Sequence, residues 1–236
     1  MKNKLLIIID GNYLFYRAFY STSWMGDYEN NAVYGFNQTL KLFNRTLKPS
    51  KIIIAFDSKG DTFRKKLDTA YKAHREGMPD ELAMQIKPLH ELLINQKIEF
   101  FAKPGIEGDD IVGILATKHH KKYNQVFIVT SDKDMNQLIR DNIYIYRYIK
   151  KQWTIVDANA IKTRYGIEPN QFIDYLALVG DTADNIPKGI PKIGPKTAVK
   201  LMNQYNTLEN IYKQPQFKQH TNRLKLNKKL VTILTK

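Results

Sequence analysis

The sequence predicts an α/β fold, with a mainly parallel sheet flanked by helices and a helical C-terminal region. Short apolar runs rich in Ile and Val alternate with longer amphipathic stretches over residues 1–157, which is the order that β-α-β units require. Several of these runs end directly in Asp, as expected where strands reach a site at the edge of an open sheet. Beyond Asp157 the pattern becomes helical. We therefore expect two regions, 1–157 and 158–236.

The charge of the chain points to a polyanionic partner. Its 236 residues carry a net charge of +14, which favours nucleic acid first and a membrane surface second. A coding bias toward Lys, Asn and Ile is the alternative explanation. Against that bias, at least seven of the 23 Asp and Glu residues stand at expected strand ends. Such a concentration of carboxylates in a basic protein suggests a metal site inside a phosphate-binding surface.

Two absences limit the class of protein. The chain has no Cys, which excludes disulfides, thiolate chemistry and Cys-bound zinc. The longest apolar run near the N-terminus, Leu5–Ile9, is too short to span a bilayer. We therefore expect neither a signal peptide nor a transmembrane helix, no membrane partner, and a cytoplasmic monomer.

The first β-α-β unit is the clearest in the sequence. A continuous apolar run predicts a buried parallel strand, and Pro49 ends the second helix before the next strand. The expected elements are, in order, a strand Lys4–Ile9, a helix from Tyr13, a loop over residues 21–31, a helix from Ala32 to Leu47 and a strand Lys51–Phe56.

The segment 61–90 differs in kind from its surroundings. It is crowded with the basic residues Arg64, Lys65, Lys66, Lys72, His74 and Arg75. Gly77-Met78-Pro79 breaks it, and Asp80-Glu81 begins a further helix. Two helices meeting at this break would form an arch above the strand ends. A solvated charged helix is an equally good interpretation of the composition.

The alternation of strands and helices continues to residue 157. We expect strands at Ile98–Phe101, Gln125–Thr130, Ile143–Tyr148 and Trp153–Val156, a helix from Glu107 to about Tyr123 and a short helix from Ser131 through Leu138. Tyr144, Tyr146 and Tyr148 lie on one face of their strand, which indicates a structural role. Trp24 and Trp153 are expected either to pack or to anchor loops, and His119-His120 to lie in a solvated basic patch.

The C-terminal region is expected to consist of helices at Ala158–Tyr165, Gln171–Val179, Lys196–Tyr205 and Leu224–Leu234, with Thr207 capping another. Pro195 follows Gly194 at the start of the third helix, where free amides form a ready phosphate site. Lys192, Lys196 and Lys200 add positive charge around it. A plain loop between helices is the alternative to a hairpin that grips a nucleic-acid backbone.

The acidic stretch Glu107-Gly108-Asp109-Asp110 is the centre of the expected site. Its carboxylates repel one another, so a cation should lie among them. Asp10, Asp57 and the pair Asp132 and Asp134 follow strands and should reach the same sheet edge. Oxygen ligands without Cys or His select Mg²⁺ or Mn²⁺. Two such ions about 4 Å apart could activate water for phosphodiester hydrolysis.

Across nearly its whole length, the chain resembles the 5′-nuclease family, which comprises the 5′ to 3′ exonuclease domain of bacterial DNA polymerase I and related flap endonucleases. The motifs that carry this resemblance are Ile9-Asp10-Gly11-Asn12 with Tyr16-Arg17, Ala32–Phe36, Phe56-Asp57, Phe63-Arg64 with Tyr71–Arg75, Pro104–Asp110, Thr130–Asp134 and Gly180–Ala198. They occur in family order and spacing. The resemblance implies a PIN-like core with a helical arch at about 61–90 and a helix-hairpin-helix region.

The resemblance also implies a function, a metal-dependent nuclease that cuts DNA at 5′ ends, nicks or the base of 5′ flaps, with a DNA polymerase as a further partner. One metal region would be held by Asp10, Asp57, Glu107, Asp109 and Asp110, and a second by Asp132, Asp134, Asp181 and Asp184. The expected catalytic residues are Asp10, Asp109, Lys72 and Arg75. The expected DNA contacts are Arg17, Arg64, Tyr71, Lys72, Arg75, Gly189, Lys192, Gly194, Lys196 and Thr197, with K⁺ held by hairpin carbonyls.

Some alternatives stay open from the sequence. Tyr71 could stack on a terminal base or pack between arch helices. Lys192 replaces the first Gly of the family hairpin and Lys188 looks inserted, which affects the hairpin's shape and its potassium site. A non-catalytic binder of branched DNA and a ribonuclease of the same architecture are the alternative functions.

Overall fold

The computed structural model describes residues 4–26 and 29–236, so Asp27 and Tyr28 of the expected loop lie outside the described residues. Its centre is a six-stranded sheet in the order β3-β2-β1-β4-β5-β6. The strands are β1 (Leu5–Asp10), β2 (Lys51–Ala55), β3 (Glu99–Phe101), β4 (Gln125–Val129), β5 (Ile143–Ile149) and β6 (Gln152–Val156). All neighbouring pairs are parallel except the β5–β6 hairpin. The expected fold class is confirmed.

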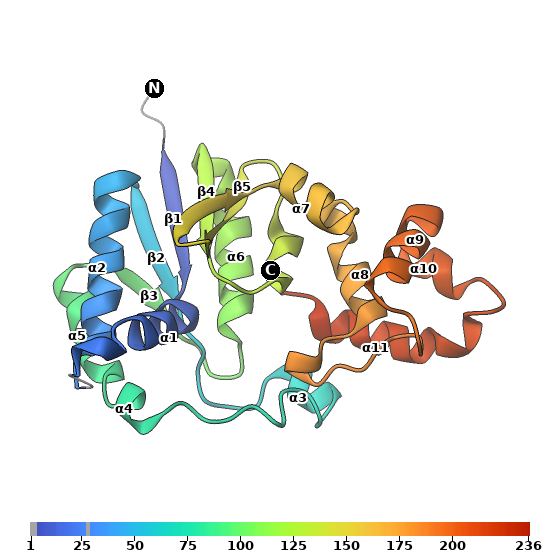
Figure 1. Ribbon diagram of the computed structural model, residues 1–236, viewed down its shortest axis with the longest axis horizontal. Helices are drawn as coiled ribbons and strands as arrows, with labels where there is room; N and C mark the ends of the chain where they lie inside the picture. Colours follow the sequence, from blue (N-terminus) through green and yellow to red (C-terminus); the bar gives the residue numbers. More distant parts are fainter. Residues whose placement is uncertain (1–3, 27–28) are drawn as a thin grey trace.

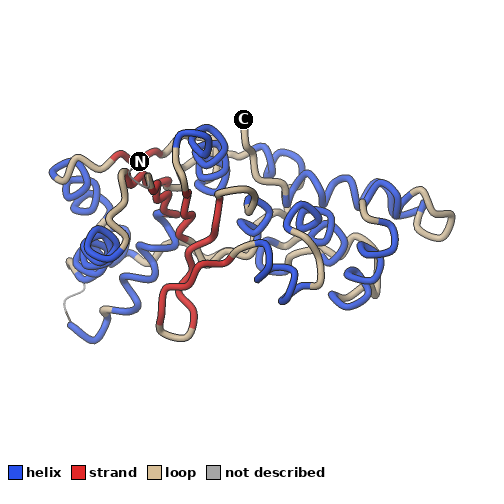
Figure 2. The backbone as a smooth tube through the Cα atoms, turned by 90° about the horizontal axis from the view of Figure 1, so that it is seen from above, coloured by secondary structure: helices blue, strands red, loops and turns tan. Residues whose placement is uncertain are grey.

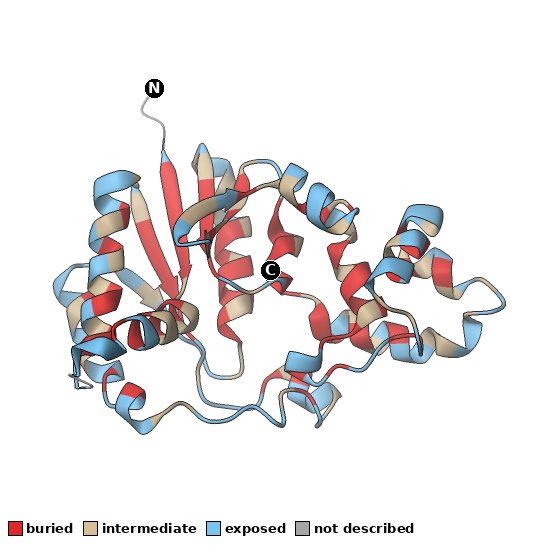
Figure 3. Ribbon diagram, in the orientation of Figure 1, coloured by how far each residue is buried: buried red, intermediate tan, exposed pale blue. Residues whose placement is uncertain are grey.

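Helices cover both faces of this sheet (Figure 1). The principal helices of the first region are α1 (Gly11–Ser21), α2 (Asn31–Thr46), α5 (Ile86–Asn95) and α6 (Gly108–His119). Because side chains alternate along a strand, Ile7 and Ile9 of β1 pack with α1, α2 and α5, whereas Leu6 and Ile8 pack with α6. Figure 3 shows the resulting buried strands between helices that are exposed on their outer sides.

The C-terminal region is helical and extends away from the sheet, whereas the β5–β6 hairpin projects in another direction (Figure 2). Its helices are α7 (Ala158–Tyr165), α8 (Phe172–Val179), α9 (Pro195–Tyr205), α10 (Leu208–Tyr212) and α11 (Thr221–Val231). Apolar residues of these helices belong to the same buried cluster as the α6 face of the sheet. The two expected regions therefore share a continuous core across residue 157.

Short 3-10 helices connect the larger elements, namely η1 (Ser23–Met25), η2 (His120–Lys122), η3 (Asp134–Leu138), η4 (Pro169–Gln171), η5 (Thr182–Asp184) and η6 (Lys218–His220). Among the helices of the described residues, none has both the length and the apolar character needed to cross a bilayer.

The arch segment is less helical than expected. It contains α3 (Phe63–Leu67), α4 (Asp80–Ala83) and the beginning of α5, and residues 68–79 between α3 and α4, here named the strap, form turns and extended backbone. Asp68 ends α3 in an extended conformation, and Lys72 has a positive φ of 54°, which interrupts right-handed helix. The strap is held by its contacts instead, since Lys72 N donates to Asp184 O (2.9 Å) and Asn185 Nδ2 donates to Ala70 O (2.9 Å). Figure 1 shows it beneath the carboxyl ends of the strands.

Candidate active site

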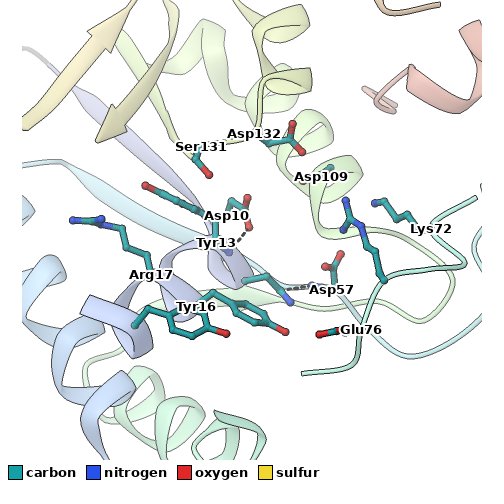
Figure 4. A pocket seen from close by; sticks show the side chains of 13 residues that line it. Asp10, Tyr13, Tyr16, Arg17, Asp57, Lys72, Glu76, Asp109, Ser131 and Asp132 are labelled. Atoms are coloured by element: carbon teal, nitrogen blue, oxygen red, sulfur yellow. Dashed lines mark hydrogen bonds between the residues drawn. The ribbon is translucent and has the colours of Figure 1, made fainter. Parts of the chain in front are cut away.

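A cavity of about 470 Å³ lies at the carboxyl ends of β1, β2 and β4. Four of the expected carboxylates line it, namely Asp10, Asp57, Asp109 and Asp132, together with Lys72, Arg75 and Glu76 of the strap. Figure 4 shows these side chains arriving from both sides of the cavity. Because each Asp follows a different strand or begins α6, the parallel sheet itself brings together residues that are far apart in sequence.

Asp10 is fixed at the junction of β1 and α1. One of its carboxylate oxygens accepts a hydrogen bond from Tyr13 N (3.0 Å), which caps α1, and the other accepts from Thr130 Oγ1 (2.9 Å). Burial raises the pKa of Asp10 to about 6 despite these two bonds, and the charges of Asp57 and Asp132 act in the same direction. The carboxylate is therefore held in place at an electrostatic cost.

The start of α6 is tied to the end of β2. Asp57 Oδ1 accepts from Gly108 N (2.6 Å), and Asp57 N donates to Asn12 Oδ1 (2.9 Å). These bonds place Asp109 at the cavity. Burial raises the pKa of Asp109 well above its ordinary value, and the nearby Asp10 and Asp132 raise it further. A cation placed among these carboxylates would relieve both effects.

A second group of acids lies on the C-terminal side and consists of Asp132, Asp134, Asp181 and Asp184. Lys133 Nζ lies 3.0 Å from Asp181 Oδ2, and Asp132 Oδ1 accepts from Asp134 N (2.8 Å). Burial raises the pKa of Asp134, and so do Asp132 and Asp181. Asp134 Oδ1 is buried and has no hydrogen-bond partner within the described residues. This orphaned oxygen is the kind of group that a metal ion would satisfy.

Cations of the strap lie between the two groups. Lys72 Nζ is 2.6 Å from Glu107 Oε2 and 3.8 Å from Asp184 Oδ2, and Arg75 pairs with the same Asp184. Although burial opposes its charge, Lys72 and Arg64 together hold the pKa of Glu107 below its ordinary value. The expected catalytic cations are thus at the acids, where they act as internal counter-ions.

Tyr71 packs rather than stacks. Its side chain is only 3% exposed, and its hydroxyl lies 3.1 Å from Glu107 Oε2 and 3.3 Å from Asp184 Oδ2. Burial and the charge of Glu107 raise the pKa of Tyr71. Of the two interpretations left open by the sequence, the structure shows packing, and the expectation of a base contact is corrected for this conformation.

Two further expectations are corrected together. Arg64 was expected to contact DNA and Asp110 to bind metal, but their side chains are buried and paired with each other, Nη1–Oδ2 at 2.7 Å and Nη2–Oδ1 at 2.8 Å. Arg64 is closed off from solvent, and Asp110 does not line the cavity. Composition could not reveal this pairing, because a basic residue in a basic segment looks like a phosphate contact.

The two Trp residues differ in their surroundings. Trp153 packs on Phe43 and Tyr146 as expected, and the guanidinium of Arg17 lies 3.7 Å from the ring centre of Tyr148 at the cavity. Trp24, by contrast, is 81% exposed, so of the two roles expected for it the structure excludes packing. Its position in η1, outside any strand or amphipathic helix, gave no periodicity from which burial could be judged.

The expected hairpin precedes α9. Gly194 is the N-cap residue, Pro195 occupies the first turn, and Lys196 and Thr197 are exposed beside it. Lys192 has a φ of 64°, so it occupies a left-handed position that favours Gly. Gly189 is buried, and a Cβ there would lie 2.3 Å from Ala177 O, so its role in this structure is close packing on α8.

Three polar residues that support the site were missed from the sequence. Asn12 and Thr130 hold Asp57 and Asp10, and both belong to strand-end motifs that could have indicated them. Arg147 of β5 is buried, and its Nη2 donates to Asp132 O (2.7 Å). A lone Arg in an alternating strand carries no sequence signal for such a contact.

The donor set fits hard divalent cations, because it consists of carboxylate oxygens that are crowded and in part unsatisfied. Among the described residues, however, no group of three or more acidic or His side chains stands in a complete metal-binding arrangement. Glu107, Asp184 and Asp181 are paired with Lys72, Arg75 and Lys133 instead. Three of the acids expected to bind metal ions are thus neutralised by cations of the chain itself in this structure.

The chain matches two profiles of one family. Residues 5–166 match the profile described as "5'-3' exonuclease, N-terminal resolvase-like domain", and residues 167–236 match "5'-3' exonuclease, C-terminal SAM fold". The chain is 43% identical over 216 residues to the 5'-3' exonuclease of Buchnera aphidicola subsp. Acyrthosiphon pisum, which is 90% of this chain and 74% of that protein. It is 36% identical over 217 residues to DNA polymerase I of Bacillus caldotenax, covering 89% of this chain and 24% of that protein.

Solved structures agree in fold. The bacteriophage T5 5'-exonuclease with bound divalent metal ions (zinc) has a TM-score of 0.80 at 20% identity, covering 97% of this chain and 89% of that chain. A T5 flap endonuclease in a pseudo-enzyme-product complex with DNA and metal ions has a TM-score of 0.79, also at 20% identity, with the same coverage of 97% and 89%. Together with the two profiles and the curated relatives, this shows that the chain belongs to the 5'-3' exonuclease family and is an enzyme of that class.

Proposed function

We propose that the chain hydrolyses DNA phosphodiesters at 5′ ends, nicks and 5′ flaps in a reaction that depends on Mg²⁺ or Mn²⁺. The observation that carries this proposal is the convergence of Asp10, Asp57, Asp109 and Asp132 on one cavity beside Lys72 and Arg75. Carboxylates select hard cations, and the strap cations suit a phosphate. The DNA and metal ions in the T5 flap endonuclease complex support the same assignment.

The two groups of acids correspond to two ions. Asp10, Asp57, Glu107 and Asp109 would hold one, and Asp132, Asp134, Asp181 and Asp184 the other. When bound, such ions activate a water and stabilise the attacking and leaving oxygens of a phosphodiester. The orphaned oxygen of Asp134 and the raised pKa values of Asp10 and Asp109 support this division, because each marks a carboxylate lacking positive charge.

Lys72 and Arg75 act on the substrate once they leave the carboxylates. Both belong to the strap, whose turns can move more readily than a continuous helix. Their positive charges would then neutralise the charge that develops on the phosphoryl oxygens. Arg17, which lines the same cavity, would contact an adjacent phosphate.

The hairpin and the start of α9 would grip the duplex backbone. Gly194 leaves amides free at the helix start, and the exposed Lys192, Lys196 and Thr197 surround it. A potassium ion held by hairpin carbonyls is part of this proposal. A DNA polymerase is also proposed as a working partner, because the chain matches a region that makes up 25% of the length of a DNA polymerase I.

Product analysis on a 5′-flap DNA substrate with titrated Mg²⁺ tests this function. We expect cleavage near the flap base that rises with Mg²⁺ and is abolished by EDTA. A matched substrate with an RNA 5′ strand separates DNA hydrolysis from a ribonuclease activity. Binding of the flap without cleavage at any Mg²⁺ or Mn²⁺ concentration would identify a non-catalytic DNA-binding protein instead.

A further inference from the structure

Arg64 and Asp110 form a buried ion pair beneath the acidic cavity. They are 2% and 1% exposed, and two parallel hydrogen bonds of 2.7 and 2.8 Å join guanidinium to carboxylate. The same Nη1 of Arg64 lies 3.4 Å from Glu107 Oε1. One guanidinium therefore contacts both Glu107 and Asp110, which flank the cavity residue Asp109 in the first turn of α6.

The pair also binds the end of the chain, here named the C-terminal segment (residues 230–234). Arg64 Nε donates to Leu230 O (2.8 Å), and its Nη2 donates to Thr232 O (2.6 Å). Asp110 Oδ1 accepts in turn from Leu234 N (2.9 Å). The segment is thus bonded to α3 at the base of the strap and to α6 at the acidic cavity.

Two further contacts fix the C-terminal segment. Gln137 of η3 donates to Val231 O and accepts from Ile233 N, both at 2.9 Å. On α6, a Cβ at Gly113 would lie 2.4 Å from Leu234 O, so only Gly allows the segment to pass this closely. The segment therefore joins three elements, α3, α6 and η3, and two of them carry acids of the proposed metal groups. Figure 1 shows the C-terminus beside α6.

Among the described residues, the carboxylate of Asp110 makes all of its hydrogen bonds within this arrangement. Its Oδ2 accepts from Arg64, and its Oδ1 accepts from Arg64 and Leu234. A metal ion bound by Asp110 would have to replace Arg64 as the partner of the carboxylate. This would leave the buried guanidinium unpaired, which is energetically costly. The carboxylate of Asp110 is therefore fully occupied by hydrogen bonds to Arg64 and Leu234.

We propose that Arg64 and Asp110 are positioning residues that hold the first turn of α6 through the C-terminal segment, so that Glu107 and Asp109 face the metal ions. Asp110 then binds no metal and Arg64 no DNA. This inference rests on the proposed metal-dependent function. Groups that orient metal ligands typically change metal affinity by about 10- to 100-fold when they are removed.

The test is Mn²⁺ binding by calorimetry to metal-free protein carrying Arg64→Gln, Asp110→Asn or both changes. We expect all three to bind the wild-type number of ions with about 10- to 100-fold lower affinity. The double variant should be no worse than the singles, since they break one unit. Lys65→Gln, an exposed neighbour on α3, is the matched control and should bind as wild type. Loss of one bound ion in Asp110→Asn, with unchanged or tighter binding in Arg64→Gln, would show that Asp110 is a ligand and overturn the proposal.

Hydrogen exchange of the metal-free proteins gives an independent measurement. The amides of Ile233 and Leu234 should exchange faster in Arg64→Gln and Asp110→Asn than in wild type, and wild-type exchange in both would overturn the proposed link.

If a single variant fails to fold, the double variant Arg64→Met/Asp110→Leu is used instead, because apolar pairs often replace buried ion pairs without loss of stability. Its Mn²⁺ affinity should fall in the same way. Failure of the wild-type protein to bind Mn²⁺ would refute the proposed function. The hydrogen-exchange result would still test whether Arg64 and Asp110 hold the C-terminal segment.

Discussion

The ammonium group of Lys72 lies 2.6 Å from Oε2 of Glu107, at the cavity where divalent ions are proposed to bind. Lys72 is also 3.8 Å from Asp184, which Arg75 contacts as well. The strap thus supplies positive charge to both groups of acids. Metal ions and strap cations compete for the same carboxylates, and a bound phosphate would offer Lys72 and Arg75 another partner.

Lys72→Met tests this competition. Removing the ammonium should tighten Mn²⁺ binding to the DNA-free protein, because Glu107 loses its internal counter-ion. It should also slow cleavage by about 10²- to 10³-fold, the usual effect of losing one group that stabilises transition-state charge. Calorimetry and single-turnover cleavage measure the two effects. Lys65→Met, exposed on α3, should change neither, and weaker Mn²⁺ binding in Lys72→Met would contradict the competition.

The stability of the metal-free protein should fall as pH rises from about 4 to 6. Burial raises the pKa of Asp10 from 3.8 to about 6, so in this range the folded state binds more protons than the unfolded state. The stabilisation from protonation is complete below the unfolded value and is lost as pH passes the folded value. Asp109 and Asp134 act in the same direction, whereas Glu107 opposes them at lower pH.

Thermal melts in EDTA across this pH range measure the effect. Asp10→Asn should melt with a shallower pH dependence than wild type, because it removes one of the titrating groups. Adding Ca²⁺ should raise the melting temperature more at pH 7 than at pH 5. A metal-free protein that becomes more stable as pH rises from about 4 to 6 would contradict the proposed crowding of the carboxylates.

Lys192→Gly should stabilise the hairpin relative to Lys192→Ala. Both changes remove the same charge, but only Gly adopts the observed φ of 64° without steric cost. The left-handed conformation costs other residues roughly 1–2 kcal/mol. In a protein of this size that corresponds to a difference in melting temperature of a few degrees. Equal melting temperatures would mean that the backbone at Lys192 relaxes in solution.

Lys196→Ala should weaken duplex binding to the same extent for different sequences. Lys196 is exposed at the start of α9, where we expect it to contact a phosphate, and phosphate contacts carry no base information. Losing one phosphate contact reduces the slope of log K against log salt by about 0.9. Lys87→Ala on α5, far along the chain from the hairpin, should leave the slope unchanged. A sequence-dependent loss would show that Lys196 reads bases.

The sequence alone was sufficient to predict the sheet and the convergence of four acidic residues at its edge. β1, β2 and β4 are continuous apolar runs that end at or before an Asp, and parallel strands bring such ends to one edge. The partners of these acids could not be predicted in the same way. Arg64 and Asp110 lie 46 residues apart and meet only because α3 packs against α6 and the C-terminal segment.

The strap shows the other limit of sequence reasoning. Its composition suggested two helices at a Gly/Pro break, but residues 68–79 follow the contacts of Ala70 and Lys72 with the loop at Asp184 and Asn185. Those contacts join segments more than a hundred residues apart. Local propensity is a weak guide wherever long-range contacts of this kind decide the backbone.

Cleavage of a 5′-flap duplex by Asp109→Ala tests the central claim most directly, that converging carboxylates bind the ions that perform hydrolysis. We expect no product from the variant at any Mg²⁺ or Mn²⁺ concentration, with duplex binding in Ca²⁺ equal to that of wild type. Turnover by Asp109→Ala at a rate close to that of wild type would contradict the claim.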